Sequence, residues 1–236
     1  MTALPIPIVA LDVPGARDAM ALVDRLAESC RFYKVGSELF AAEGPAVVRD
    51  LQRRGCDVFL DLKFHDIPNT VRGAVRSAAG IGAALVTVHA SGGLAMLEAA
   101  VEGASAGGEG CGVLAVTVLT SLDAPALGSA WGRDDVDIAT EVLRLAGLAR
   151  RAGAHGVVCA GTEAAAVRAQ HGTALAVLVP GIRLEGGTRD DQARVVTPAA
   201  AVAAGARYLV LGRVVTAAAD PLVAMQQVAT ALQRPA

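Results

Sequence analysis

Short runs of mostly apolar residues recur along the chain, and their apolar residues stand at consecutive positions instead of at every second one. Uninterrupted runs of this kind are typical of parallel strands that are buried on both faces. The pattern predicts eight strands, over Ile6–Asp12, Phe32–Gly36, Val58–Lys63, Leu85–His89, Val113–Thr120, Gly156–Cys159, Ala176–Pro180 and Tyr208–Gly212.

Segments of helical composition, rich in alanine and arginine, separate these runs. Four of the segments end at a glycine that stands three residues before the next run, namely Gly55, Gly82, Gly153 and Gly205. Glycine in this place is typical of the left-handed residue that follows a helix. Helices are predicted over Ala16–Ser29, Pro45–Arg54, Thr70–Ala79, Ile138–Ala152 and Glu163–Gln170.

The alternation of eight strands with helices in 236 residues predicts a fold of the α/β class, a (β/α)8 TIM barrel. We expect one domain over residues 1–236, because no interdomain linker is evident. A doubly wound open sheet is the alternative, but eight units are more than such a sheet usually contains. The long polar connection Ser121–Asp137 is expected to form a mobile loop over a site.

The composition argues against several classes of partner. A net charge of −2 does not suit nucleic-acid binding, and 3% aromatic residues do not suit base stacking. No apolar run approaches the roughly 20 residues needed to span a bilayer, and no signal peptide is evident. The four cysteines lack metal-ligand spacing and stand at apolar runs, so we expect buried, reduced thiols in a cytoplasmic protein.

Charged residues gather at the carboxyl ends of the predicted strands, where barrel enzymes have their active sites. Four of them belong to the first three strands, namely Asp12, Lys34, Asp61 and Lys63. A rim exposed to water would be the simpler explanation for one such residue. Four charges at the edge of an apolar core favour a functional site, because charges are costly to desolvate.

The spacing of Asp61 and Lys63 indicates an ion pair inside the barrel. Residues two apart on a regular strand point to the same face. At about 4 Å and an effective dielectric constant near 20, their attraction is roughly 4 kcal/mol. Lys34 on the neighbouring strand can reach the same pocket. Asp66 lies beyond the strand, before Pro68, so its side chain is expected to point outward or toward a neighbour.

A second candidate site lies in the segments Val179–Pro198 and Leu211–Thr216, which follow the seventh and eighth strands. Loops in these positions commonly bind phosphate in barrels. Arg183 and Arg213 could add bidentate contacts to the anion. An ordinary charged surface loop is the alternative. Together with the charges of the first three strands, the arginines suggest a phosphorylated small molecule across the barrel mouth.

Several motifs in combination resemble the orotidine 5′-phosphate decarboxylase family, which catalyses the last step of UMP biosynthesis. They are "VALD" at 9–12, "YKVG" at 33–36, "DLKFHDIPNTV" at 61–71, "VTVHASGG" at 86–93, "TVLTS" at 117–121, "VPGIR" at 179–183 and "LGR" at 211–213. The resemblance implies a homodimeric barrel that decarboxylates orotidine 5′-monophosphate without a metal or an organic cofactor. Many members have a proline directly after the last arginine, where this chain has Val214.

The resemblance also implies roles for single residues at the reacting end of the substrate. Lys63 would deliver the proton to the carbon that loses CO2, and Asp61 would face the substrate carboxylate. Asp12 and Lys34 would hold ribose hydroxyl groups, and Lys34 would also belong to the charge array.

The remaining roles implied by the resemblance concern the partner subunit and the rest of the substrate. Three residues would reach into the partner's site, with Asp66 joining its catalytic charges: Asp66, Ile67 and Thr70. Thr120 would contact the pyrimidine. The phosphate end would be formed by Pro180, Arg183, Gln192, Gly212 and Arg213.

Two other functions stay open at this point. Metal-dependent keto-sugar-phosphate decarboxylases and hexulose-phosphate synthases share the D-x-K-x-x-D string, but they typically carry a glutamate ligand on the second strand. Lys34 occupies that region here and would repel Mg²⁺. A non-catalytic barrel that binds nucleotide phosphates is the other alternative, although it would not need Asp61, Lys63 and Asp66 together.

Overall fold

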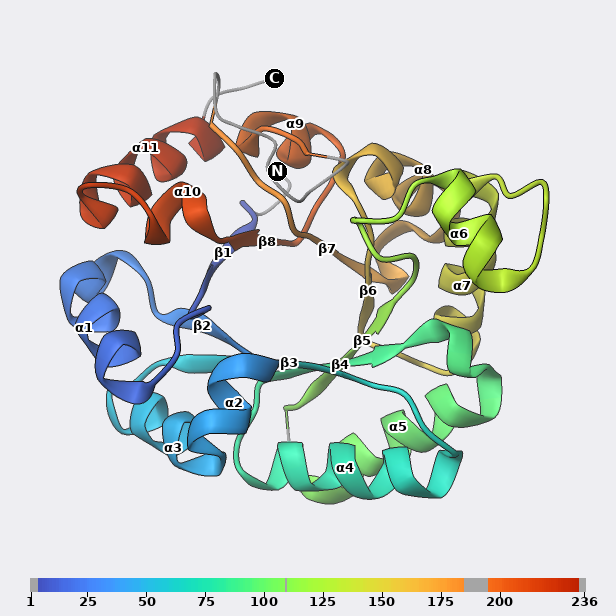
Figure 1. The fold of residues 1–236 in the computed structure, drawn as a ribbon, viewed down its shortest axis with the longest axis horizontal. Coiled ribbons are helices and arrows are strands. Elements are labelled where there is room, and N and C mark those ends of the chain that lie inside the picture. The colour runs from blue at the N-terminus through green and yellow to red at the C-terminus, as the bar shows by residue number, and fades with distance from the viewer. Residues whose placement is uncertain (1–3, 109, 185–194, 234–236) are drawn as a thin grey trace.

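The computed structural model describes residues 4–108, 110–184 and 195–233. Eight parallel strands pair in sequence order, and β8 pairs with β1, so the sheet closes into a barrel with the helices around it (Figure 1). The predicted (β/α)8 barrel is therefore confirmed. The strands are β1 (Ile6–Ala10), β2 (Phe32–Gly36), β3 (Asp57–Phe64), β4 (Leu85–His89), β5 (Gly112–Val116), β6 (Gly156–Val158), β7 (Ala176–Val179) and β8 (Tyr208–Leu211).

The eight predicted runs identify the strands, but the predicted ends of β1 and β5 are wrong. β1 ends at Ala10 and β5 at Val116, so Asp12 and Thr120 lie beyond the strands they were assigned to. Leu11 and Val118 remain almost completely buried after pairing has stopped. The predicted ends lie too far along the chain because an apolar pattern indicates which residues are buried, and burial continues past the last paired residue.

The helices lie on the outside of the strand ring (Figure 1). They are α1 (Ala16–Leu26), α2 (Ser37–Glu43), α3 (Pro45–Arg53), α4 (Pro68–Gly80), α5 (Leu94–Gly107), α6 (Ala124–Trp131), α7 (Ile138–Arg151), α8 (Gly161–His171), α9 (Pro198–Ala203), α10 (Arg213–Thr216) and α11 (Pro221–Gln233). Short 3-10 turns follow α1, β4 and α8, at Ala27–Ser29, Ala90–Gly92 and Gly172–Ala174.

Several helix predictions need correction, and one of them concerns α8, which begins at Gly161, two residues before the expected start at Glu163. The connection Ser121–Asp137, expected to be a loop, contains α6. The carboxylate of Asp123 caps this helix by accepting a hydrogen bond from the amide of Ala126, which satisfies one of the free donors at a helix start. Helix α4 begins at Pro68, two residues before the expected start at Thr70, because proline suits the first turn of a helix.

The core has two parts, one on each side of the barrel wall. Inside the barrel, apolar side chains from alternate strand positions pack together, among them Ile8, Phe59, Leu114 and Leu178. A larger cluster fills the space between the strands and the surrounding helices. The barrel interior is thus filled with apolar side chains below its mouth.

The cysteines behave as the sequence indicates. Cys30, Cys56 and Cys159 are buried, Cys111 is partly buried, and all four are free thiols. Burial raises the pKa of Cys111 to about 11, so its reactive thiolate form is disfavoured at neutral pH.

Candidate active site

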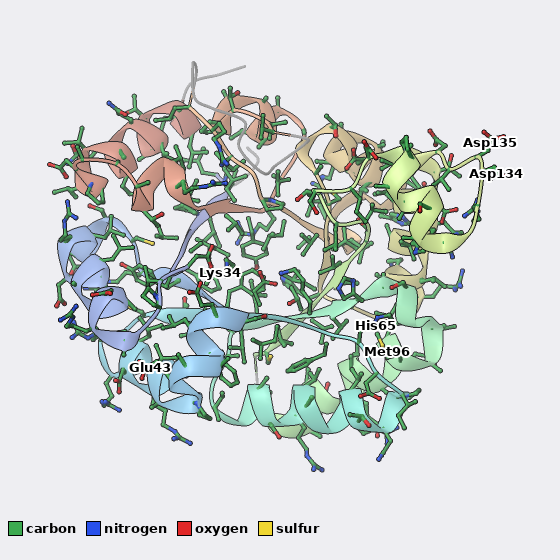
Figure 2. All side chains as sticks on the ribbon, viewed as in Figure 1. Lys34, Glu43, His65, Met96, Asp134 and Asp135 are labelled. Carbon is green, nitrogen blue, oxygen red and sulfur yellow. The ribbon has the colours of Figure 1, made fainter. Side chains whose placement is uncertain are left out.

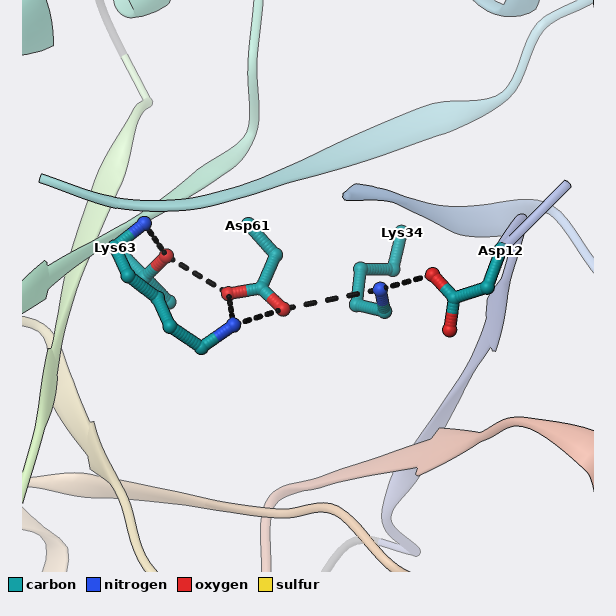
Figure 3. A network of polar contacts seen from close by, with 5 residues as sticks. Asp12, Lys34, Asp61 and Lys63 are labelled. Atoms are coloured by element: carbon teal, nitrogen blue, oxygen red, sulfur yellow. Dashed lines mark hydrogen bonds and ion pairs between the residues drawn. The ribbon is translucent and has the colours of Figure 1, made fainter. Parts of the chain in front are cut away.

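Four side chains form a row of alternating charge at the carboxyl ends of β1, β2 and β3 (Figure 3). The ammonium of Lys34 lies 2.7 Å from Asp12 Oδ1 and 3.8 Å from Asp61 Oδ2. The ammonium of Lys63 donates to both carboxylate oxygens of Asp61, at 2.9 Å each. Each inner charge therefore has an oppositely charged neighbour on both sides, which compensates its desolvation.

The row is buried in its middle and open at its ends. The side chains of Lys34 and Asp61 are 10% and 13% exposed, whereas those of Lys63 and Asp12 are 38% and 59% exposed. Figure 2 shows Lys34 pointing into the ring of strands. With a 38% exposed side chain, Lys63 is held by Asp61 and still accessible to a bound molecule.

The backbone around Lys63 is not a regular strand. Its φ is +51°, in the left-handed region that residues with a side chain seldom adopt, and the pairing of β3 with β4 shifts between Leu60 and Phe64. The amide of Lys63 donates to the hydroxyl of Thr87 on β4, at 2.9 Å. Asp61 and Lys63 form an ion pair, as the sequence indicated. The expected reason, that residues two apart on a regular strand point to the same face, is wrong, because the strand is irregular at Lys63.

The charge row forms one wall of a cavity of about 510 Å³ at the barrel mouth. Five further residues predicted from the sequence line the same cavity: Thr120, Pro180, Arg183, Gly212 and Arg213. Gln192 lies outside the described residues. The cavity therefore brings together the reacting end and the phosphate end of the predicted site, although Asp12–Lys63 and Pro180–Arg213 lie in opposite halves of the sequence.

Some lining residues were not predicted. Phe59 stands two positions before Asp61 on the same inner face, and the segment after β5 adds Leu119 and Ser121. Thr216 is the last residue of α10, three positions after the arginine of the "LGR" motif, in the segment Leu211–Thr216 that the sequence indicated as a whole. The period of two along β3 was a usable signal for Phe59, whereas the other residues depend on how loops fold over the mouth.

The arginines stand on two short segments at the mouth. Pro180 and Gly181 follow β7, and Gly181 has a φ of +72°, which glycine adopts without steric cost. The amide of Arg183 then donates to the carbonyl of Val196, at 3.0 Å, next to an isolated bridge between Ile182 and Val196. Arg213 is the first residue of α10, directly after Gly212.

Asp66, Ile67 and Thr70 do not line the cavity of their own chain. They lie in the turn after β3 and the first turn of α4, where all three are exposed. Asp66 Oδ1 accepts a hydrogen bond from the amide of Ile67, at 2.6 Å, and Ile67 is 67% exposed. The expectation that Asp66 points away from its own site agrees with this arrangement.

The rings of His65 and His89 lie in contact near Lys63, tilted by 44° to each other and with ring centroids 5.4 Å apart. Burial, followed by the charges of His65 and Lys63, lowers the pKa of His89 below its ordinary value, so the neutral ring is favoured. The sequence assigned these histidines no role.

A larger depression of about 760 Å³ opens at the opposite end of the barrel. It is lined by strand starts such as Ile6, Phe32 and Leu85, and by Tyr208, whose hydroxyl bonds to His155. That end of a barrel usually serves stability. Its lining includes Arg31 and Asp57 but none of the site residues predicted from the sequence, so the smaller cavity is the candidate active site.

The model of the orotidine 5′-phosphate decarboxylase / HUMPS family matches residues 5–228. The chain belongs to this family. It is 54% identical over 223 residues to orotidine 5′-phosphate decarboxylase of Anaeromyxobacter sp. (strain K), with 94% of this chain and 96% of that protein covered. It is 53% identical over 218 residues to the enzyme of that name from Alkalilimnicola ehrlichii, with 92% of each covered.

The fold also matches a solved member of the family. The crystal structure of orotidine 5′-phosphate decarboxylase from Lactobacillus acidophilus superposes with a TM-score of 0.87 at 34% identity, covering 98% of this chain and 100% of that one. Within the described part of the chain, no group of three or more His, Cys, Asp or Glu side chains could hold a metal ion. Among residues 4–108, 110–184 and 195–233, no helix is long and apolar enough to cross a membrane.

Proposed function

We propose that the charge row Asp12–Lys34–Asp61–Lys63 is the catalytic centre for decarboxylation of orotidine 5′-monophosphate to UMP. The family and the relatives at 54% identity support this activity, the final step of UMP biosynthesis. The observation that carries the proposal is the ammonium of Lys63, held 2.9 Å from Asp61 and open to the cavity.

The chemistry requires charge stabilisation without an electron sink. The bond between the ring carbon and the carboxylate carbon breaks, CO2 leaves, and the electron pair stays on the ring carbon. Lys63 places a positive charge where this negative charge develops, so it stabilises the transition state more than the bound substrate. Its ammonium then gives a proton to the carbon, and the amine regains a proton from water.

Asp61 and Lys34 complete the reacting end. In the proposed complex, the carboxylate of Asp61 faces the substrate carboxylate, and this repulsion is relieved when neutral CO2 leaves. We rank this contribution below the stabilisation by Lys63. The ammonium of Lys34, 2.7 Å from Asp12, keeps the row neutralised and positions both side chains to hold ribose hydroxyls.

The other end of the cavity takes the phosphate. Arg183 and Arg213 line the same cavity as Lys63 and can form charge-assisted hydrogen bonds with an anion. Pro180, Gly212 and Gln192 complete the proposed phosphate end, and Thr120 contacts the pyrimidine. Binding energy from the phosphate keeps the ring in register with Lys63.

We further propose that the protein is a cytoplasmic homodimer in which Asp66, Ile67 and Thr70 enter the partner's site. The exposure of all three outside their own cavity supports this, since their side chains are available to a second subunit and Ile67, at 67% exposed, would add apolar area to the contact. We also infer a single domain over residues 1–236, because one barrel uses strands from both ends of the described chain.

Incubation of the purified protein with orotidine 5′-monophosphate, followed by ultraviolet absorbance, tests the proposed function. We expect turnover to UMP at the same rate with and without a chelator, because Lys34 stands beside the carboxylates where a cation would bind. Turnover that a chelator abolishes, or turnover of a keto-sugar phosphate with Mg²⁺ in place of orotidine 5′-monophosphate, would support the metal-dependent keto-sugar-phosphate decarboxylases or hexulose-phosphate synthases.

A further inference from the structure

Thr87 connects the two residues at the reacting end of the charge row. It lies in β4, between two apolar valines, and its side chain is completely buried. Its hydroxyl accepts a hydrogen bond from the amide of Lys63 and donates one to Asp61 Oδ1, each at 2.9 Å. The residue does not line the cavity, so it acts on a bound molecule only through these two neighbours.

The direction of these bonds is fixed by the groups involved. A hydroxyl has one hydrogen, and the amide of Lys63 can only donate. The hydroxyl of Thr87 therefore uses a lone pair for the amide and has its hydrogen left for the carboxylate of Asp61. This carboxylate receives the hydroxyl and the Lys63 ammonium on the same oxygen, which sets its orientation beside Lys63.

The backbone of Lys63 depends on the same contact. A φ of +51° is unfavourable for lysine and persists only where the surroundings impose it. The pairing of β3 with β4 shifts at this point, so the amide of Lys63 lacks a regular backbone partner and bonds to Thr87 instead. The hydroxyl replaces a missing contact of the sheet at the position from which the lysine side chain enters the cavity.

We propose that Thr87 is a positioning residue for the decarboxylation, which holds the Lys63 ammonium and the Asp61 carboxylate in the geometry that the reaction needs. This inference rests on the proposed function. Since Thr87 reaches neither the ribose nor the phosphate end, its loss affects the reacting geometry more than substrate binding.

The test compares Thr87→Val with Thr87→Ser in the orotidine 5′-monophosphate assay. Valine keeps the shape and removes both hydrogen bonds, and we expect kcat to fall roughly 10- to 100-fold, the effect of losing a hydrogen bond to a charged group. KM and the affinity for UMP should stay within about 3-fold of wild type. A 3-fold change corresponds to less than half of the free energy of a hydrogen bond to a charged group. Serine keeps the hydroxyl and should restore most of the activity.

Thr117→Val is the matched control. Thr117 follows β5, is 3% exposed, and its hydroxyl donates to the carbonyl of Val158, at 2.8 Å, without contact to the charge row. This variant should lose stability but keep the wild-type kcat. If Thr87→Val does not fold, Thr87→Ala removes the same hydroxyl without placing a methyl group beside the carboxylate.

The outcomes separate the two proposals. An active wild type together with a Thr87→Val variant of unchanged kcat would contradict the role of Thr87 and leave the proposed function intact. A similar loss of kcat in Thr117→Val, or a loss in Thr87→Ser as large as in valine, would also contradict it. A wild type without turnover would overturn the proposed function, and with it the role of Thr87.

Discussion

The ammonium of Lys63 lies at 2.9 Å from each carboxylate oxygen of Asp61, in a bidentate ion pair at the mouth of the barrel. The carboxylate is mostly buried, while the lysine is more than a third exposed to the cavity. A substrate carboxylate that enters beside Asp61 must share this lysine with it. In the proposed mechanism, the pair therefore binds the reactant under repulsion and keeps a cation beside the carbon that becomes negative.

The proposed exchange of residues between subunits predicts complementation. Lys63→Ala and Asp66→Ala should each be inactive as homodimers, because every site then lacks one member of its catalytic charges. After the two variants are mixed and exchange subunits, hybrid dimers contain one site in which Lys63 and the partner's contribution are both native. We expect activity to return toward a quarter of the wild-type value, since about half of the dimers are hybrids with one intact site.

Mass spectrometry of differently tagged subunits is the control for exchange in this experiment. If hybrid dimers form and the mixture stays inactive, Asp66 acts in its own chain and the proposed shared site is wrong.

The proposed contact between Arg213 and the substrate phosphate predicts that replacing Arg213 affects only substrates that carry a phosphate. Arg213→Ala should raise KM for orotidine 5′-monophosphate by roughly 10- to 100-fold, because a charge-assisted hydrogen bond to the phosphate is lost. Steady-state kinetics with orotidine, which lacks the phosphate, provide the control. The slow turnover of orotidine should be equal in variant and wild type. If kcat/KM falls equally with both substrates, Arg213 does not contact the phosphate.

His89 predicts a pH dependence of stability. Its pKa in the folded protein is lowered from 6.5, so the folded state binds this proton less readily than the unfolded chain. The contribution of neutral His89 to the free energy of unfolding is fully present above the pKa of the unfolded chain, 6.5, and is lost as the pH falls below this value. Between about pH 8 and about pH 5.5, the melting temperature of His89→Gln should fall less than that of wild type.

The pKa values of His155 and His171 are lowered as well, so the variant should keep part of the acid-induced loss. Equal losses in wild type and His89→Gln would show that His89 titrates alike in the folded and unfolded chains.

Helices α4 and α5 approach so closely that glycine is required between them. A Cβ at Gly103 would lie 2.4 Å from the carbonyl oxygen of Arg72, although alanine is the better helix former. Gly103→Ala should therefore lower the free energy of unfolding by about 1–3 kcal/mol, measured by urea titration. Gly147 in α7 has no atom within 4 Å of such a Cβ, so Gly147→Ala should stabilise the protein by up to about 1 kcal/mol. A stabilising Gly103→Ala would contradict the close packing.

The barrel could be predicted because its strands are buried on both faces and leave uninterrupted apolar runs. The strand ends could not, because Leu11 and Val118 stay buried beyond the last paired residue. Helix α6 was missed because its segment is short and was interpreted as a polar connection, although Asp123 is a typical N-cap. The approximate bounds of such short helices depend on tertiary packing, which a sequence pattern does not contain.

The candidate site was predictable as far as charge stands out from an apolar background. Asp12, Lys34, Asp61 and Lys63 were proposed in this way, the family motifs added residues around Arg183 and Arg213, and all of these that the structure describes line one cavity or belong to the turn after β3. Thr87 was missed because threonine in an apolar strand is an ordinary wall residue. Its connection to Lys63 arises from a shift in strand pairing that no spacing along the chain reveals.

The catalytic role of Lys63 is tested most directly by the turnover of Lys63→Ala, measured together with its affinity for UMP. The account predicts that turnover falls by at least about 10⁴-fold, because both the charge beside the reacting carbon and the proton donor are removed, as for other groups that act chiefly in the transition state. UMP should still bind measurably through the phosphate end. Turnover near the wild-type rate in a variant that binds UMP would contradict the account.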